Sequence, residues 1–386
     1  MTFYVDPKTL LDALKFVGMT IQQRGEPLYR NVQLQVEGDT LIISATDYEL
    51  VAIKTLPIFI TSSIEQTPIS SLLVNHNDFF LRLGALETSV TIKVTFKSDG
   101  LHINTNDEDV IFVAVYQKKV KKQVAEFYPD FPAKFKSDSE KQYTVPVSDL
   151  LHSLKKVIHA KCNDETRQNL MWIVIENDTI WATDGSRLVV APFPWLFSSR
   201  LYFSSRVCED LIEFLGDSTE NKVNIQKIDD FVMFYDTSSK LAARSVSSMP
   251  PPCIQKQLNA VEANNCVIQT PKKSILKSLT LALAHVDLKT NPNGVIKLFL
   301  ANDCNAHFEL LDKPHVKSSI QDLYWPYPDI EIKCSGKHVY DFLTTSKTKH
   351  ITIKINPNAR FRFQLAELDR DGFETRCELF TIIPDN

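Results

Sequence analysis

A proline followed by an amphipathic helical pattern occurs three times along this chain of 386 residues. The pattern begins at Pro7, Pro146 and Pro271, and proline suits the start of a helix. After each proline, leucine or isoleucine residues return at helical spacing, which places them on one helix face. A pattern that recurs at long intervals indicates repeated structural units. The fold must therefore be one that three similar domains can build.

Each repeat continues in the same order, with strand-like segments, a second helical segment and further strands. Alternating apolar and β-branched residues predict the strands, and the second helices are predicted over 77–83, 208–215 and 337–343. Such helices must bury their apolar face against a sheet. We therefore predict an α+β fold of three repeated domains, each with two helices packed on antiparallel sheet. Polar, proline-bearing segments divide these domains at 1–127, 128–255 and 256–386.

The composition indicates a soluble cytoplasmic protein without catalytic machinery. The chain is 44% hydrophobic and 23% charged, which is ordinary for globular domains. Its seven cysteines are odd in number and show no Cys-x-x-Cys spacing, which favours a reducing compartment. We recognise no signal peptide, membrane span, phosphate-binding loop or metal motif. The sequence thus predicts no catalytic residue, no metal site and no cofactor, and no membrane partner.

The charge distribution separates the first helices from the rest of the chain. Regions 6–24, 146–161 and 271–289 carry net charges of +1, +2 and +3, although the whole chain carries −4. On the first helix, Lys8 and Lys15 fall opposite the apolar stripe. Diffuse positive charge of this kind suits loose contact with nucleic-acid phosphates. The alternative, that these lysines are only solvated helix faces, stays open.

Several motifs resemble those of the bacterial sliding clamp, the beta subunit of DNA polymerase III. They are Ala45-Thr46-Asp47, the heptad from Ala182 to Leu188, and Phe127-Tyr-Pro-Asp-Phe-Pro132. The resemblance implies a head-to-tail homodimer ring that encircles double-stranded DNA and tethers a DNA polymerase, with a clamp loader as a further partner. The chain departs from the family at Leu170-Met171-Trp172 and at its C-terminus, so the resemblance is to a divergent member.

The helix charges and the resemblance together suggest three groups of functional residues. DNA contacts are expected from Arg24, Lys155, Lys156, Arg167, Lys273 and Lys277. A pocket for partner peptides is expected from Leu170, Thr183, Gly185, Arg187, Leu188, Pro250, Ile382, Ile383 and Pro384. The dimer interface is expected from Phe112 and Ala114 of the strand 110–116, together with His285 and Val286.

Each expectation has a rival. The whole chain could be a clamp-fold scaffold that binds proteins without encircling DNA. The strand 110–116 could be a covered edge in a monomer. The C-terminal residues could merely close the third domain. Ile383 stands where the resemblance implies methionine, and a β-branched side chain is stiffer, so a retained pocket should accept a narrower or altered set of peptides.

Overall fold

The structure is a computed structural model in which two compact units are described. Unit 1 comprises Met1–Val147 and Glu213–Val246, and unit 2 comprises Ser148–Ile212 and Ser247–Asn386. The residues described are 1–21, 26–62, 71–86, 91–97, 100–105, 109–113, 142–195, 197, 199–245, 266–287, 289, 291, 294–302, 305–311, 313–356, 362–368 and 374–380.

Unit 1 contains one large and one small antiparallel sheet. Large sheet 1 has the strand order β10-β15-β16-β17-β4-β3-β2-β6, and small sheet 1 has the order β5-β1-β7-β8-β9. The elements of this unit are β1 (Thr2–Val5), α1 (Pro7–Gly18), η1 (Pro27–Arg30), β2 (Asn31–Glu37), β3 (Thr40–Thr46), β4 (Leu50–Pro57), β5 (Phe59–Ser62), β6 (Ser71–Asn75), α2 (His76–Ala85), β7 (Ile92–Lys97), β8 (Gly100–Asn104), β9 (Asp109–Val113), β10 (Gln142–Pro146), β15 (Lys222–Ile228), β16 (Phe231–Tyr235) and β17 (Ser239–Arg244).

Unit 2 repeats this architecture. Large sheet 2 has the order β14-β11-β12-β13-β25-β24-β23-β18, and small sheet 2 has the order β21-β20-β19-β22. Its elements are α5 (Val147–Val157), η2 (Ile158–Ala160), η3 (Gln168–Leu170), β11 (Trp172–Glu176), β12 (Thr179–Thr183), β13 (Arg187–Pro192), β14 (Leu201–Ser204), β18 (Cys266–Pro271), α8 (Lys272–Leu283), β19 (Val295–Leu300), β20 (His307–Leu310), β21 (Lys317–Ser319), β22 (Ile330–Ser335), α9 (Gly336–Thr345), β23 (His350–Ile355), β24 (Arg362–Leu368) and β25 (Glu374–Phe380). Helix α6 (Ser205–Asp217) has residues in both units.

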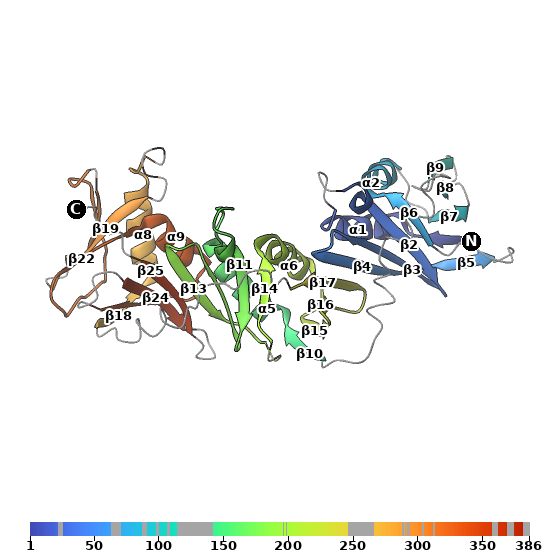
Figure 1. The fold of residues 1–386 in the computed structure, drawn as a ribbon. Helices are drawn as coiled ribbons and strands as arrows, with labels where there is room; N and C mark the ends of the chain where they lie inside the picture. Colours follow the sequence, from blue (N-terminus) through green and yellow to red (C-terminus); the bar gives the residue numbers. More distant parts are fainter. Residues whose placement is uncertain are drawn as a thin grey trace. The chain divides into compact units, whose positions relative to one another are not determined.

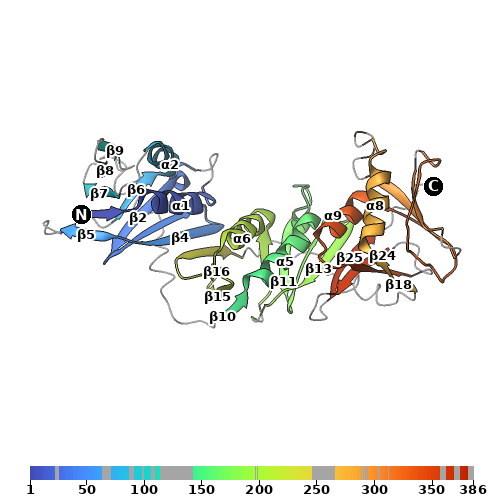
Figure 2. The same ribbon diagram turned by 180° about the vertical axis from the view of Figure 1, so that it is seen from behind.

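The helices form where the repeat predicts them, and α1 shows why. Pro7 occupies the first turn, and the Asp6 carboxylate accepts a hydrogen bond of 2.7 Å from the backbone N–H of Thr9. Leu10, Leu14 and Val17 are buried along one face. This face packs on β3 and β4, with α2 lying beside α1 (Figure 1). The equivalent pair α8 and α9 lies side by side in unit 2 (Figure 2).

The large sheets cross the domain borders predicted from the sequence. In large sheet 1, β4 pairs antiparallel with β17, so strands of the predicted first and second domains share one sheet. In large sheet 2, β13 pairs in the same way with β25, which joins the predicted second and third domains. The two compact units therefore divide the predicted middle domain between them, and its borders stay a prediction. None of the helices described is long and apolar enough to span a membrane.

Candidate functional site

Five lysines of the three first helices are exposed, whereas Lys156 is buried and Lys272 is half-buried. Lys8 and Lys15 of α1, Lys155 of α5, and Lys273 and Lys277 of α8 all face solvent. Their side chains lie away from the apolar stripes that hold each helix on its sheet, as the 100° rotation per residue predicts. Exposed ammonium groups on successive helices can contact phosphates without reading bases. Arg24, assigned to the same surface, lies outside the described residues.

Lys156 corrects the sequence-based prediction, because it is buried rather than exposed. Its ammonium forms an ion pair with the Glu367 carboxylate of β24, and both side chains are almost fully covered. The ammonium also lies 5.5 Å from the centre of the Phe342 ring. Burial lowers the pKa of Lys156 to about 8, although the charge of Glu367 opposes this. The charge of Lys156 is therefore balanced by Glu367 inside unit 2, and Lys156 cannot contribute to an exposed positive face.

The segment from Thr183 to Leu188 forms a tightly bonded turn between β12 and β13. The Thr183 hydroxyl donates to the Arg187 carbonyl at 2.6 Å and accepts from the Gly185 N–H at 3.1 Å. The Asp184 carboxylate accepts from the backbone N–H groups of Ser186 and Arg187, at 2.8 and 3.0 Å. Gly185 has a φ of 88°, a conformation that glycine adopts without strain.

Of the predicted pocket residues, only some face the surface. Leu188 is 1% exposed and packs against Val174, Trp181 and Val190. Thr183 and Arg187 are also buried. Leu170 is partly exposed and lies beside Gly185, since a Cβ added to Gly185 would lie 3.4 Å from a Leu170 methyl carbon. The remaining predicted walls, Pro250, Ile382, Ile383 and Pro384, lie outside the described residues.

Arg167, predicted to contact DNA, lies next to this turn. A Cβ added to Gly185 would lie 3.1 Å from Nη1 of Arg167. The Arg167 side chain is 56% exposed and forms an ion pair with Asp164 at 3.4 Å. Arg167, Leu170 and Gly185 therefore share one patch of surface.

The Arg187 guanidinium is the centre of a buried polar cluster that the sequence did not indicate. It donates to Asp184 at 3.0 Å, to Asp341 of α9 at 2.9 Å, and to the backbone carbonyl of His159. His338 lies 3.7 Å from Asp184, and burial lowers its pKa to about 4. Burial also lowers the pKa of His159 to about 3. Both imidazoles are thus neutral at neutral pH, and the guanidinium is balanced by two carboxylates.

The predicted interface residues lie at separate places in the two units. β9 is an edge strand of small sheet 1, and it contains Phe112, whose side chain lies outside the described part of the structure. Ala114 also lies outside the described residues. His285 and Val286 follow the end of α8, where their N–H groups donate at 3.1 Å to Ala282 and Leu283. His285 is exposed and Val286 is partly buried.

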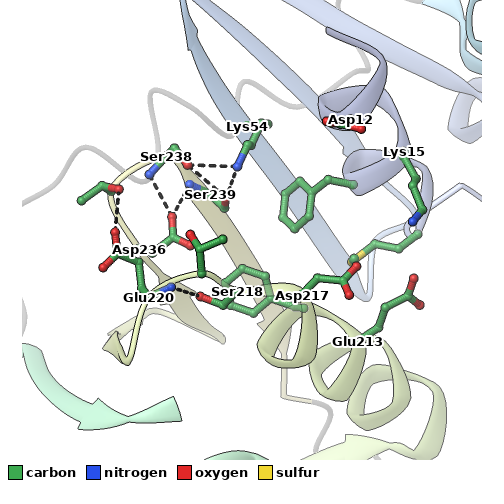
Figure 3. A pocket seen from close by; sticks show the side chains of 15 residues that line it. Asp12, Lys15, Lys54, Glu213, Asp217, Ser218, Glu220, Asp236, Ser238 and Ser239 are labelled. Atoms are coloured by element: carbon green, nitrogen blue, oxygen red, sulfur yellow. Dashed lines mark hydrogen bonds between the residues drawn. The ribbon is translucent and has the colours of Figure 1, made fainter. Parts of the chain in front are cut away.

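Unit 1 contains a cavity of about 340 Å³ beside α1. Figure 3 shows Lys54 turned toward Ser238 and Ser239, whose hydroxyls accept from its ammonium at 2.9 and 2.6 Å. The lining contains five carboxylates and two lysines: Asp12, Glu213, Asp217, Glu220, Asp236, Lys15 and Lys54. This excess of negative charge disfavours a phosphate ligand. Within the described parts of the chain, no group of three potential ligand side chains is arranged to hold a metal ion.

Comparison with known proteins places these features in context. Residues 1–115 match the family model for the N-terminal domain of the DNA polymerase III beta subunit. No curated protein matches the chain in sequence.

Similar solved structures cover essentially the whole chain. The DNA polymerase sliding clamp of Bacillus subtilis is 15% identical, with a TM-score of 0.83 over 100% of both chains. The DNA polymerase III beta subunit of Thermotoga maritima is 16% identical, with a TM-score of 0.78 over 100% of both. The Helicobacter pylori beta clamp bound to a DNA ligase peptide is 16% identical, with a TM-score of 0.78 over 99% of this chain and 100% of that one. At these identities the likeness shows the fold.

Proposed function

We propose that this chain, whose N-terminal domain belongs to the DNA polymerase III beta-subunit family and whose whole length has the sliding-clamp fold, is a processivity clamp. It encircles double-stranded DNA and tethers polymerase and other replication proteins to it. The observation that carries the proposal is the clamp fold over the full length of the chain, together with the family match of the first domain. In this role the protein is not an enzyme, needs no cofactor and works in the cytoplasm.

The arrangement of strands supports a head-to-tail homodimer. Each large sheet is built by strands of two predicted domains, whereas small sheet 1 and small sheet 2 have five and four strands. Among the strands that the structure describes, small sheet 1 ends at β5 and β9, and small sheet 2 ends at β21 and β22. Exposed strand edges favour pairing with another chain. Pairing β9 of one copy with one edge of small sheet 2 of the next would cover those two edges, and two such contacts would close a ring.

DNA contact in this ring rests on the exposed lysines of α1, α5 and α8. Ammonium groups that face the hole would hold the duplex through phosphates and release counterions on binding. The positive surface is uneven, because Lys156 is buried against Glu367 and α6 carries one basic residue against four acidic ones. We therefore expect weak, strongly salt-dependent contact, which suits a ring that slides.

Retention on DNA tests this function. Clamp loaded on nicked circular DNA should stay bound and should be released when the circle is cut, because only a closed topology traps a ring. The triple variant Lys155→Ala, Lys273→Ala, Lys277→Ala should load less well. The slope of log affinity against log salt should also fall by about 0.9 for each phosphate that the variant no longer neutralises.

A matched control removes three exposed lysines from strands instead, namely Lys93, Lys97 and Lys222. The control variant keeps the same net charge as the test variant and should load as the wild type does. Equal reductions in the two variants would reject the helix face as the DNA surface. Equal retention of wild type on circular and cut DNA would reject the ring itself.

A clamp-fold scaffold that no longer encircles DNA is the second candidate. Its support is the burial of the positive charge of Lys156 and the acidic character of α6. This candidate predicts peptide binding with no retention on circular DNA, so the same assay separates the two.

Partner peptides are proposed to bind at the turn from Thr183 to Leu188. The Helicobacter pylori clamp in the comparison is bound to a DNA ligase peptide, which makes such a peptide a suitable probe. Leu170 and Gly185 would offer an apolar surface and close backbone approach. Removal of Ile382 to Asn386 should weaken binding if the C-terminus forms the other wall. Undiminished binding by a folded truncation would remove the C-terminus from the site.

A further inference from the structure

We propose that Asp341 of α9 is a positioning residue for partner binding, because it fixes Arg187 and through it the turn from Thr183 to Leu188. The proposal rests on the proposed function, since it takes this turn as part of the peptide site. Asp341 is 154 residues away from Arg187 in sequence, yet its carboxylate accepts from Arg187 Nη1 at 2.9 Å.

The guanidinium of Arg187 is held by partners from three elements. Nε donates to Asp184 in the turn, Nη1 donates to Asp341 in α9, and Nη2 donates to the carbonyl of His159 in η2. The residue is only 5% exposed. A planar fork with three simultaneous partners has one orientation that satisfies all of them. Arg187 therefore connects the turn rigidly to α9.

Asp341 is the partner that brings a negative charge from outside the turn. Asp184 also contacts Arg187, but its other oxygen is engaged by the N–H groups of Ser186 and Arg187. The nearby imidazoles of His159 and His338 cannot balance the charge of Arg187, because an imidazole is either neutral or positive. Without Asp341, Nη1 would be a buried donor deprived of its charge-assisted bond. The guanidinium would then shift, and Asp184 would move with it.

The consequence is local to the turn. The Asp184 carboxylate accepts hydrogen bonds from two backbone N–H groups, and the Thr183 hydroxyl accepts from a third. A displaced Asp184 loosens these bonds and lets Gly185 leave its position beside Leu170. A peptide that binds this surface must then order the turn as it binds, which lowers its affinity. Asp341 thus acts on the peptide without being required to touch it.

Two measurements on the full-length chain test this role. Hydrogen exchange at the amides of Gly185, Ser186 and Arg187 reports the order of the turn. Titration with a fluorescent DNA ligase peptide reports affinity. Asp341→Ala should speed exchange at these amides and weaken peptide binding, each by about tenfold, as expected when one hydrogen bond to a buried charge is removed.

Two further variants calibrate the result. Asp341→Asn keeps an acceptor oxygen but no charge, and should give an intermediate effect. Lys337→Ala removes a charged side chain from the same helix without touching Arg187, and should match the wild type in both measurements. Amides of β11 and β12 should exchange at wild-type rates in all variants. If Asp341→Ala speeds their exchange as well, Asp341→Asn replaces it as the test variant.

The outcomes separate this proposal from the function on which it rests. Unchanged exchange at the turn in Asp341→Ala overturns the positioning role. Faster exchange with unchanged affinity overturns it too, because the turn would then be ordered without effect on the peptide. If the wild type binds no peptide, the proposed peptide site fails, whereas the exchange data still decide whether Asp341 orders the turn.

Discussion

The buried pair of Lys156 and Glu367 permits a stability prediction whose size follows from one pKa. Burial lowers the pKa of Lys156 from its usual 10.5 to about 8, with Glu367 opposing the change. One pKa unit is equivalent to about 1.36 kcal/mol, so at pH 7 the charged amine of the folded protein is favoured over the neutral amine by only about 1 kcal/mol. If the carboxylate is removed, Lys156 can release its proton, and this limits the decrease in stability.

We therefore predict that Glu367→Gln lowers the free energy of unfolding by about 1 kcal/mol at pH 7. A broken buried ion pair usually costs roughly 3–5 kcal/mol. Because the folded pKa of Lys156 is below its unfolded pKa, the unfolded state binds more protons between about pH 8 and 10.5, and wild-type stability rises with pH across that window. In Glu367→Gln the pKa of Lys156 in the folded state is lower still, so the stability of this variant begins to rise at lower pH. The difference between the two proteins should nearly vanish at pH 9.

Urea unfolding followed by tryptophan fluorescence measures this difference. All four tryptophans, at positions 172, 181, 195 and 325, lie in unit 2 together with the ion pair. The control Glu374→Gln breaks the more exposed pair with Lys354 and should cost less than about 1 kcal/mol at both pH values. A Glu367→Gln decrease above about 3 kcal/mol that is equal at pH 7 and pH 9 would show that Lys156 cannot discharge in the folded protein, and the reasoning would be refuted.

Three further changes have defined outcomes. Gly185→Ala forces an alanine to a φ of 88° and should lower stability by about 1–3 kcal/mol and weaken peptide binding, as thermal melts and titration would reveal. His159→Phe should lose less stability than the wild type as pH falls from 6.5 to 4, and the difference should reach about 3 kcal/mol at pH 4. The reason is that the pKa of His159 in the folded protein is about 3, so only the unfolded wild type takes up the proton in this range. Parallel acid-unfolding curves of the two proteins would contradict this. Phe112→Asp should convert a ring of two chains into monomers of 44.0 kDa in sedimentation analysis, and an unchanged mass would exclude β9 from the interface.

The helices and their buried faces could be predicted because the information is local. In α1 the proline, the capping aspartate and the apolar spacing all lie within one short segment, and the structure confirms the helix there. The repetition of this segment predicted three α+β domains, and the resemblance of the motifs at 45–47, 127–132 and 182–188 to the sliding clamp implied the clamp fold. The prediction that Lys156 lies on the exposed face of α5 was wrong. The buried face of α5 is wider than its leucine stripe, because Ser153 and Val157 are buried as well.

Long-range polar contacts could not be predicted from the sequence. Nothing near Lys156 in sequence indicates Glu367, and nothing near Arg187 indicates Asp341, because these partners come together only in the tertiary structure. Arg187 was predicted to line a pocket, and its local motif gives no sign that all three of its nitrogens are already engaged. Charge patterns along a helix therefore identify candidate surfaces, whereas the pairing of each charge depends on tertiary structure.

The continuous large sheets determine where this chain can be cut. A fragment that ended at residue 127 would keep β4 but lose β17, and a fragment that began at residue 256 would keep β25 but lose β13. Each fragment would expose an unpaired strand edge and should aggregate when expressed alone. Because the two compact units interleave along the sequence, a continuous fragment that keeps both β4 and β17 also contains β13, and it loses β25 unless it extends to residue 380. The repeat visible in the sequence is therefore not a unit that can be expressed alone.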